Sequence, residues 1–573
     1  MKKKLFSFQS VLLIGILFLG LFLRLFRLDQ APSRLTVDEM SFGYNAFSIL
    51  KTGNDEWGRT LPLIFEAFGD FKQPLYVYAT VPFIFLFGLN DVSVRLPSVI
   101  AGTMLIVLSY FLVKEKMGMR TALITSFLIA VSPWAVHLSR MGFESNLALT
   151  LFVGGLLSLQ QSLKTSKKKW TVISGILFGL TFYTYIAYRL IVILFFIGVA
   201  TYFYLQKQNR KFFLPLLIFF VIVISPLTSQ LLGSGGTARF SQVSIFFDKG
   251  IEAKVIEQQN YCFLTFRTVL PKICRVFFNK YTFITSQFTQ NYFSFFSPHF
   301  LFWEGDEVEY LNPPGYGEFI LLFLPFYVVG LWYFFSRSDG QSRLWQWILL
   351  IAPIPSALVA GPQIVRGSLV MFFLTVIIGL GLVKISESFN KKLLRNFPII
   401  LIAILSLLGT FQYFTHYHAV YAQQYETAFS PFPNELLEVI QQEEKNYTTL
   451  YFSDSFFSDA HMFVAFYQQI DPAWYQQNVV RPQPDSFGFS HPVQLGKYEF
   501  GNKNIDSFVC DINSTKVLYF TNDQEFKIED SKVVIKDFAE VHPQVKAVDI
   551  DDYREKLTSE KSLELLCSSN TQN

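Results

Sequence analysis

The fold is decided around residues 35–78, which read LTVDEMSFGYNAFSILKTGNDEWGRTLPLIFEAFGDFKQPLYVY. Only 16% of the residues of this chain are charged, yet this stretch is dense in them. They are Asp38, Glu39, Lys51, Asp55, Glu56, Arg59, Glu66, Asp70 and Lys72. An apolar run precedes the stretch, and more than three hundred mostly apolar residues follow it. Ionisable groups beside a membrane bundle indicate a functional site.

A purely structural interpretation stands beside this one. Thr36 and Glu39 have the spacing of a capping box, and an acid in the first helical turn suits the helix dipole. Asp38 and Glu39 would then do no more than start a helix. The pattern alone leaves both interpretations open.

The composition of the whole chain indicates a polytopic membrane protein. Its 573 residues are 51% hydrophobic and 17% aromatic, and they include 65 Phe. Apolar runs of roughly 17 to 22 residues, each long enough to cross a bilayer, recur along the chain. The amino terminus has three lysines before its apolar run and no small-residue cleavage site after it, which predicts an uncleaved first membrane helix.

Eleven crossings are expected. They are placed at 11–23, 93–113, 121–138, 147–163, 170–187, 190–205, 212–228, 316–335, 344–360, 367–383 and 397–415. The basic clusters of the short loops all fall on one side only if the apolar stretch 75–89 does not cross. The positive-inside rule makes that side, and the amino terminus, cytoplasmic. The stretch 75–89, within an outer loop at 28–92, is then re-entrant or lies along the outer surface, which implies a cavity beside Lys72.

Four lone arginines fall on the outer side against this rule. They are Arg95, Arg140, Arg189 and Arg366. Each alone is explained by an arginine that extends to the interface. Together with Lys72 they predict a cradle for an anion, because the planar guanidinium group gives paired hydrogen bonds to phosphate.

Glu144 lies at the same expected end, four residues after Arg140. One interpretation is an ion pair between these two residues on one helix face. The other makes Glu144 a second acid facing Asp38, so that the two carboxylates share a proton or a divalent cation.

Two further regions lie outside the membrane in this prediction. The outer loop 229–315 is rich in Phe and Tyr, which favours interfacial helices covering the cavity. Residues 416–573 have the character of a small extracytoplasmic α/β domain. In it, ELLEVIQQEE and AHMFVAFYQQI predict helices, and TTLYFSD and TKVLYFTN predict strands.

All four cysteines fall in these outer regions. Cys262 and Cys274 lie in the long loop, and Cys510 and Cys567 lie in the terminal domain. This placement predicts disulfides in an oxidising compartment, with three pairings open. The sequence has no Cys/His metal spacing, phosphate-binding glycine loop or nucleophile elbow, which argues against ATP-driven work and serine-type hydrolysis.

Several segments together resemble a known family. FGDFKQPLYVY, GLNDVSVRLPSVIAG, SPWAVHLSRMGFESNLA, YTYIAYR, FSPHFLFWEGD and APIPSALVAGPQIVRGS follow the acidic pair in order. They resemble the GT-C superfamily of polyprenyl-phosphate-sugar glycosyltransferases, in its protein O-mannosyltransferase and aminoarabinose transferase group (glycosyltransferase family 39-like). The resemblance covers about residues 10–420, and it implies a GT-C transmembrane module over 1–415.

The resemblance implies inverting transfer of a sugar, a hexose such as mannose or a pentose, from a polyprenyl-phosphate donor to a hydroxyl acceptor on the extracytoplasmic face of the cell membrane. Asp38 matches the first acid of the family's Asp-Glu pair and would be the base. Glu144 matches the acid in the family's second outer loop, and Lys72 matches the lysine before the proline pair, near the donor phosphate. This chain has Gln73 where relatives often have a proline.

Two other functions remain open at this point. An enzyme of the same fold would glycosylate a glycolipid or a polysaccharide instead of a protein, and acceptor choice lies in the outer loops. A transporter or flippase would also have a polar cavity in a helical bundle. Against it, the charges gather at one face and not at the midplane, and no hydropathy repeat is evident.

Overall fold

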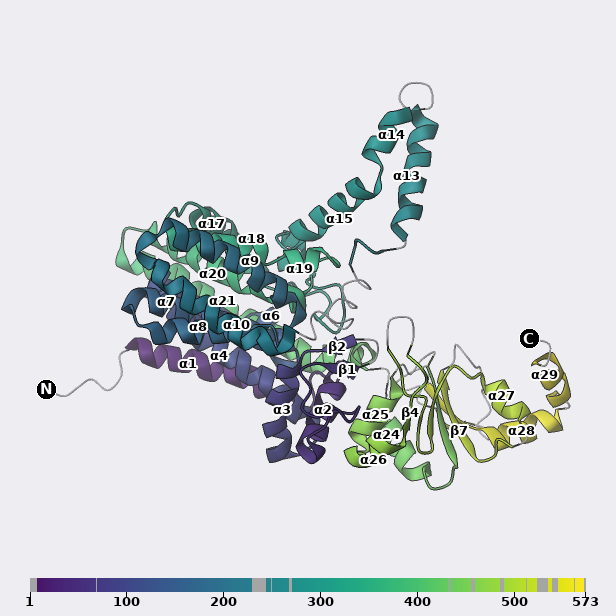
Figure 1. Cartoon of the computed structure of the whole chain (residues 1–573). Helices are drawn as coiled ribbons and strands as arrows, with labels where there is room; N and C mark the ends of the chain where they lie inside the picture. Colours follow the sequence, from purple (N-terminus) through teal and green to yellow (C-terminus); the bar gives the residue numbers. More distant parts are fainter. Residues whose placement is uncertain are drawn as a thin grey trace. The chain divides into compact units, whose positions relative to one another are not determined.

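The computed structural model describes residues 8–570 apart from 68–69, 229–243, 249, 267–270, 431, 433, 455–458, 485–488, 512, 523–533, 538–544 and 561. The described residues pack as two compact units (Figure 1). The first unit comprises residues 1–32, 73–76 and 95–424, and the second comprises 33–72, 77–94 and 425–573. The chain therefore passes between the units five times.

The first unit is a helical bundle built from the apolar runs. Its main helices are α1 (Phe8–Leu25), α4 (Asp91–Met117), α5 (Met119–Val131), α6 (Pro133–Arg140), α7 (Glu144–Thr165), α8 (Lys168–Thr181), α9 (Ile186–Leu205), α10 (Phe213–Ile224), α17 (Leu324–Phe335), α18 (Gly340–Ile351), α20 (Ile364–Glu387) and α21 (Lys392–His416). Every one of the eleven expected runs coincides with one or two of these helices. Within the described residues, seven helices are long and apolar enough to span a membrane, or eight if the bent pair α5–α6 is one span.

Helix α20 is the centre of this bundle. Most of its apolar span is buried, whereas α1, α10 and α21 leave most of theirs uncovered. It packs closely on α17, where a Cβ added at Gly381 would lie 1.9 Å from the Phe326 carbonyl oxygen and one at Gly330 would lie 2.0 Å from that of Ile377. Small residues at a helix interface let two backbones approach in this way.

Helix α3 (Pro74–Phe87) covers the stretch that is expected not to cross. Its 14 residues extend about 21 Å, which is short of the roughly 30 Å hydrocarbon core. The helix also contains Pro82. These features support the non-crossing prediction, while the number of crossings and their orientation stay predictions.

The long outer loop is helical where it is described. It forms α13 (Gly250–Phe266), α14 (Pro271–Phe277), α15 (Lys280–Ser294) and α16 (Pro298–Phe302). Helices α13, α14 and α15 extend away from the bundle as an arm (Figure 1), and a disulfide between Cys262 and Cys274 joins the first two. The expectation of helices in this loop is confirmed, whereas their place at the membrane interface and over a cavity stays a prediction.

The second unit contains a mixed sheet with the strand order β4-β5-β6-β3-β7-β9-β8. The strands are β3 (Thr449–Ser453), β4 (Val479–Val480), β5 (Gln494–Leu495), β6 (Tyr498–Gly501), β7 (Val517–Asn522), β8 (Val534–Asp537) and β9 (Val545–Asp549). Central β3 runs parallel to β6 and β7, and its residues are almost all buried, as is usual for a strand covered on both faces.

Helices accompany this sheet. They are α24 (Asn434–Glu443), α25 (Ala460–Tyr467), α26 (Pro472–Asn478), α27 (Ile505–Cys510), α28 (Ile550–Ser559) and α29 (Leu563–Asn570). A disulfide between Cys510 and Cys567 joins α27 to α29. The helices and strands expected in this domain are confirmed, and the two disulfides select one of the three open pairings.

The second unit also contains part of the stretch that opened the sequence analysis. Residues 33–72 form α2 (Val37–Thr52) and a hairpin of β1 (Phe65–Ala67) and β2 (Asp70–Lys72). Helix α2 packs on α25 and α26. The sequence pattern predicts a boundary between residues 415 and 416 and gives no sign that residues 33–72 fold with the carboxy-terminal residues.

Glu56 is a buried acid in this unit. Asn45 Nδ2 donates to its carboxylate over 3.2 Å, and the Glu56 amide donates to Asn45 Oδ1 over 3.1 Å. Burial raises the pKa of Glu56 from 4.5 to about 7, against the opposing charge of Arg481. The folded state therefore binds the proton more tightly than the unfolded chain does.

We expect this group to make stability depend on pH. Because its folded pKa is raised, its stabilising contribution is complete below about pH 4.5 and is lost as the pH rises to about 7. Glu56→Gln keeps the Asn45 contacts and should remove this part of the pH dependence of stability. From about pH 5 to about pH 8, the stability of the variant should therefore rise relative to that of the wild type. Thermal unfolding at both pH values measures the difference, and equal shifts for the two proteins would contradict the prediction.

Topology is tested by labelling single introduced cysteines in intact cells. All four native cysteines are in disulfides, so they give no background. Lys167→Cys, on the expected cytoplasmic side, should not react with an impermeant thiol reagent, whereas Asn54→Cys should react. Reaction at both positions would show that α3 crosses the membrane.

Candidate functional site

Thr36 and Glu39 form the capping box that starts α2. The Glu39 amide donates to Thr36 Oγ1 over 3.3 Å, and the Thr36 amide donates to Glu39 Oε2 over 3.0 Å. Glu39 is buried. The structural interpretation of the acidic pair thus describes Glu39, while Asp38 takes no part in the box.

Asp38 contacts Lys72 instead. Lys72 Nζ donates to Asp38 Oδ1, which joins two residues that are 34 positions apart. The Asp38 side chain is 58% exposed and that of Lys72 only 8%. The lysine is fixed at the end of β2, paired across the hairpin with Phe65, and its ammonium lies 5.7 Å from the centre of the Phe42 ring. An accessible carboxylate beside a buried cation is the arrangement that a base next to an anion site requires.

Other charged residues of the stretch have structural partners. Asp55 Oδ1 accepts hydrogen bonds from the amides of Trp57 and Arg59, which closes the turn after α2. Arg59 in turn pairs with Glu66 of β1. These residues stabilise the loop. Asp38 and Lys72 differ from them, because they pair with each other.

In the first unit, Arg95 and Arg140 are buried and bind backbone carbonyls. Arg95 donates to the carbonyl oxygens of Leu28 and Pro32, each over 2.9 Å. Arg140 donates to those of Leu23, Phe26, Arg27 and Ala31. Both guanidinium groups therefore hold the turn that follows α1. A phosphate role for either stays a prediction, and these contacts support the structural alternative.

Arg189 lies at the start of α9. Its Nε donates to the Phe182 carbonyl over 3.2 Å, and one of its terminal nitrogens donates to the side chain of Gln73. The neighbouring Leu75 amide donates to the Tyr183 carbonyl over 2.8 Å. Gln73, which stands where relatives often have a proline, thus orients Arg189. It directly follows Lys72.

Arg366 and Glu144 are brought together around Tyr185. The buried Tyr185 hydroxyl lies within electrostatic reach of the Arg366 guanidinium and of the Glu144 carboxylate. Glu144 opens α7 and Arg366 lies in the first turn of α20. Tyr185 was not expected from the sequence, although it belongs to the YTYIAYR segment that carries the resemblance.

Asp306 holds the start of α20 and thereby the position of Arg366. Its Oδ2 accepts the amide of Ile364 over 3.0 Å, and its own amide donates to Glu318 Oε1 over 3.1 Å. Both acids are buried, and burial raises the pKa of Asp306 to about 6. Sequence reasoning missed both acids. Asp306 ends the segment FSPHFLFWEGD, which carries part of the resemblance. This pattern did not show whether Asp306 caps a helix or is a loop acid.

A metal at Asp38 and Glu144 stays a prediction. Among the residues that the structure describes, no group of three or more His, Cys, Asp or Glu side chains is placed to hold a metal ion. Asp38 lies in the second unit and Glu144 in the first, and each is described within its own unit.

Comparison with known proteins supports the resemblance. Residues 72–229, which include Lys72, Arg95, Arg140, Glu144 and Arg189, match the family model of dolichyl-phosphate-mannose-protein mannosyltransferases. A protein of Bacillus subtilis (strain 168) named "Putative mannosyltransferase YycA" is 32% identical over 112 residues. That match covers 19% of this chain and 16% of the relative.

The fold is also shared with solved structures. ArnT from Cupriavidus metallidurans in the apo state superposes with a TM-score of 0.51 at 12% identity, covering 95% of this chain and 98% of that one. The same protein bound to undecaprenyl phosphate gives a TM-score of 0.52 at 13% identity, covering 94% and 97%. At this identity the likeness concerns the fold. The chain has the polytopic GT-C fold, and its resemblance to the glycosyltransferases of that superfamily is confirmed.

Proposed function

We propose that this protein is an integral membrane glycosyltransferase that moves a sugar from a polyprenyl-phosphate donor to a hydroxyl acceptor, with inversion, on the extracytoplasmic face. The observation that carries the proposal is the contact of exposed Asp38 with buried Lys72. It occurs on a fold shared with a protein that was solved with undecaprenyl phosphate bound.

The chemistry assigns a role to each group. The acceptor oxygen attacks the anomeric carbon, its proton passes to the Asp38 carboxylate, and the bond from the anomeric carbon to the phosphate oxygen breaks with its electron pair. The polyprenyl phosphate leaves with the added negative charge, which cations stabilise. Lys72 supplies such a cation in the second unit. We assign donor-phosphate binding in the first unit to Arg366 and Arg189, with Glu144 as an acid close to Arg366.

The sugar, a hexose such as mannose or a pentose, and the acceptor, a protein or a glycolipid, are finer points of the same proposal. Nothing in the mechanism requires a nucleotide, and Asp38 and Glu144 are the candidates for a divalent cation if one is needed. Mass spectrometry of surface proteins and glycolipids from cells with and without the gene identifies the acceptor. A sugar lost from neither class would favour a polysaccharide acceptor or the transporter alternative.

Asp38→Asn should abolish transfer while the protein still folds, since the capping box belongs to Thr36 and Glu39 and an amide takes up no proton. We expect a loss of about 10²–10⁴-fold in kcat, the usual contribution of a general base. Transfer is measured with a synthetic polyprenyl-phosphate sugar. Asp70→Asn, in the hairpin that carries Lys72, is the matched control and should stay active. If Asp38→Asn keeps more than about a tenth of the rate, another group is the base.

Lys72→Ala and Arg366→Ala should weaken use of the donor more than use of the acceptor. Each removes a charge-assisted hydrogen bond worth about 1.5–3 kcal/mol, so kcat/KM for the donor should fall about ten- to a hundredfold. Arg366→Lys should recover part of the loss, because a point charge replaces a fork. Exposed Lys51 gives a control alanine variant. Kinetics in which both variants impair acceptor use alone would overturn the phosphate assignment.

A further inference from the structure

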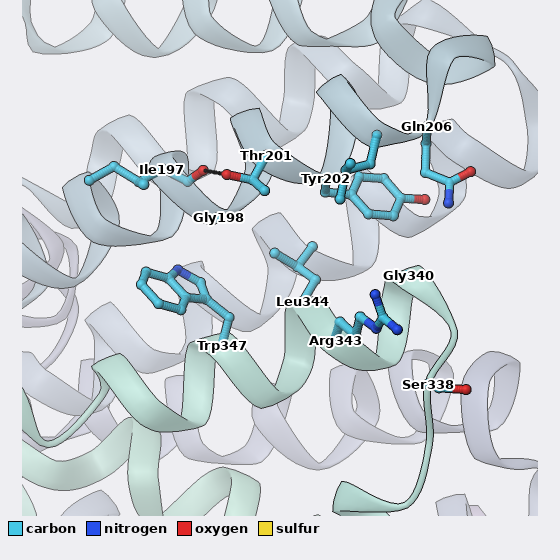
Figure 2. Close-up of a pocket in the computed structure, with 11 residues that line it drawn as sticks. Ile197, Gly198, Thr201, Tyr202, Gln206, Ser338, Gly340, Arg343, Leu344 and Trp347 are labelled. Carbon is cyan, nitrogen blue, oxygen red and sulfur yellow. Dashed lines mark hydrogen bonds between the residues drawn. The ribbon is translucent and has the colours of Figure 1, made fainter.

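A groove lies between α9 and α18, in the first unit and apart from every residue assigned to the reaction (Figure 2). Its volume is about 520 Å³. The wall of α9 is flattened at Gly198, where an added Cβ would lie 2.3 Å from the Trp347 ring. Trp347 is fixed in turn, since its indole nitrogen donates to the Leu194 carbonyl over 3.0 Å.

The two ends of the groove differ in polarity. Ile197 and Trp347 form an apolar end, whereas Arg343 and Gln206 lie at the other end (Figure 2). The Arg343 guanidinium projects from α18 toward the part of α9 that carries Gln206. An occupant that matches both ends has an apolar chain and an anionic or polar head.

Arg343 differs from the cations around it. Lys116 forms an ion pair with Asp339, and Arg337 donates to the Lys116 carbonyl over 3.4 Å. The Arg343 side chain is exposed, and it makes no hydrogen bond or ion pair within the part of the chain that the structure describes. An arginine without a carboxylate partner is available for an anion, and its fork suits phosphate.

The apolar end is exposed on α9. Ile197 is 54% exposed, on a helix that is long and apolar enough to span a membrane. We propose that the groove binds an anionic phospholipid, with an acyl chain against Ile197 and Trp347 and the head-group phosphate on Arg343. Free phosphate would leave the apolar end empty.

The proposal is tested by native mass spectrometry of the delipidated full-length protein, titrated with phosphatidylglycerol, phosphatidylcholine or inorganic phosphate. Phosphatidylglycerol should bind, and Arg343→Gln should weaken its binding about tenfold, as loss of one charge-assisted hydrogen bond predicts. Ile197→Trp should also weaken it by filling the apolar end. Arg210→Gln is the control, because Arg210 lies beyond the end of α9 and donates to the Tyr204 carbonyl.

Three outcomes would overturn the proposal. The first is unchanged phosphatidylglycerol binding in both Arg343→Gln and Ile197→Trp. The second is equal binding of phosphatidylcholine, which would remove the charge preference. The third is displacement of the lipid by inorganic phosphate at similar concentrations, which would make the site one for free phosphate.

A separate observation in the second unit concerns how Asp38 is held. A Cβ added at Gly43 of α2 would lie 2.5 Å from the Phe466 ring of α25, so the bare glycine lets the two helices touch. Tyr44 donates its hydroxyl to the Ile470 carbonyl over 3.1 Å. Gln476 Nε2 of α26 lies within hydrogen-bond distance of Ser48 Oγ (3.1 Å) and of the Asp55 carbonyl (2.8 Å).

These contacts fix α2, which carries Asp38 in its first turn. A helix transmits its orientation along its length, because each turn is bonded to the next. We infer that α25 and α26 position Asp38 for the proposed reaction, and that Gln476 is a positioning residue. This inference rests on the proposed function and gives the carboxy-terminal domain a part in catalysis.

Gln476→Ala should lower kcat about tenfold, because a small misplacement of a base is costly, while the donor KM stays within about twofold. Gln494→Ala is the matched control, since Gln494 Nε2 donates to the Gly496 carbonyl within the sheet domain. Amide hydrogen exchange should quicken in α2 of Gln476→Ala and not in β3. Single-turnover titration measures the fraction of active enzyme. It therefore shows whether a lower rate of Gln476→Ala comes from slower catalysis or from fewer active molecules.

An unchanged kcat in Gln476→Ala, or a loss that equals the fall in active fraction, would overturn the positioning role. Asp38→Asn distinguishes this failure from a failure of the proposed function. If Asp38→Asn is inactive and Gln476→Ala is not impaired, only the positioning role is wrong. If Asp38→Asn is fully active, another group is the base, and if the wild type transfers no sugar, the proposed function itself fails.

Discussion

Buried arginines that bind backbone carbonyls are the interaction on which the first unit depends. The peptide bond before Pro133 breaks the helix, because proline has no amide hydrogen to give the Ile129 carbonyl, and α5 and α6 bend by 53° there. Arg24 donates to the carbonyls of Ile129 and Ala130, over 2.9 and 3.1 Å. Arg95 and Arg140 do the same for the turn after α1. Carbonyls left without partners in an apolar bundle would cost several kcal/mol each.

This constraint divides the arginines of the bundle into two kinds. The guanidinium groups of Arg95 and Arg140 donate to several backbone carbonyls of the turn after α1. Arg189 instead donates to one carbonyl, that of Phe182, and to the neutral side chain of Gln73. Arg189 is therefore a cation that a neutral side chain orients.

The sequence predicted what depends on composition and local pattern. The apolar runs became helices, and the strand signals around residues 449–453 and 517–522 became β3 and β7. The sequence pattern did not show which residue of the acidic pair caps the helix, because a capping box and a catalytic site use the same residue types. The contacts of Glu39 identify it as the capping residue. The arginine cradle was predicted from charge alone, which does not show that nearby carbonyls need donors. The packing of α2 on α25 had no local signal, since the residues lie more than four hundred positions apart.

That last distance has a consequence for how the protein is made. The segment with Asp38 leaves the ribosome early, but Ile470, which accepts the Tyr44 hydroxyl, follows 426 residues later. At roughly 5–20 residues per second, synthesis of the intervening chain takes about 20–85 s. During that interval α2 is without α25 and α26, the helices that it packs on. The packing of α2 is thus completed only by residues that are translated more than four hundred positions later.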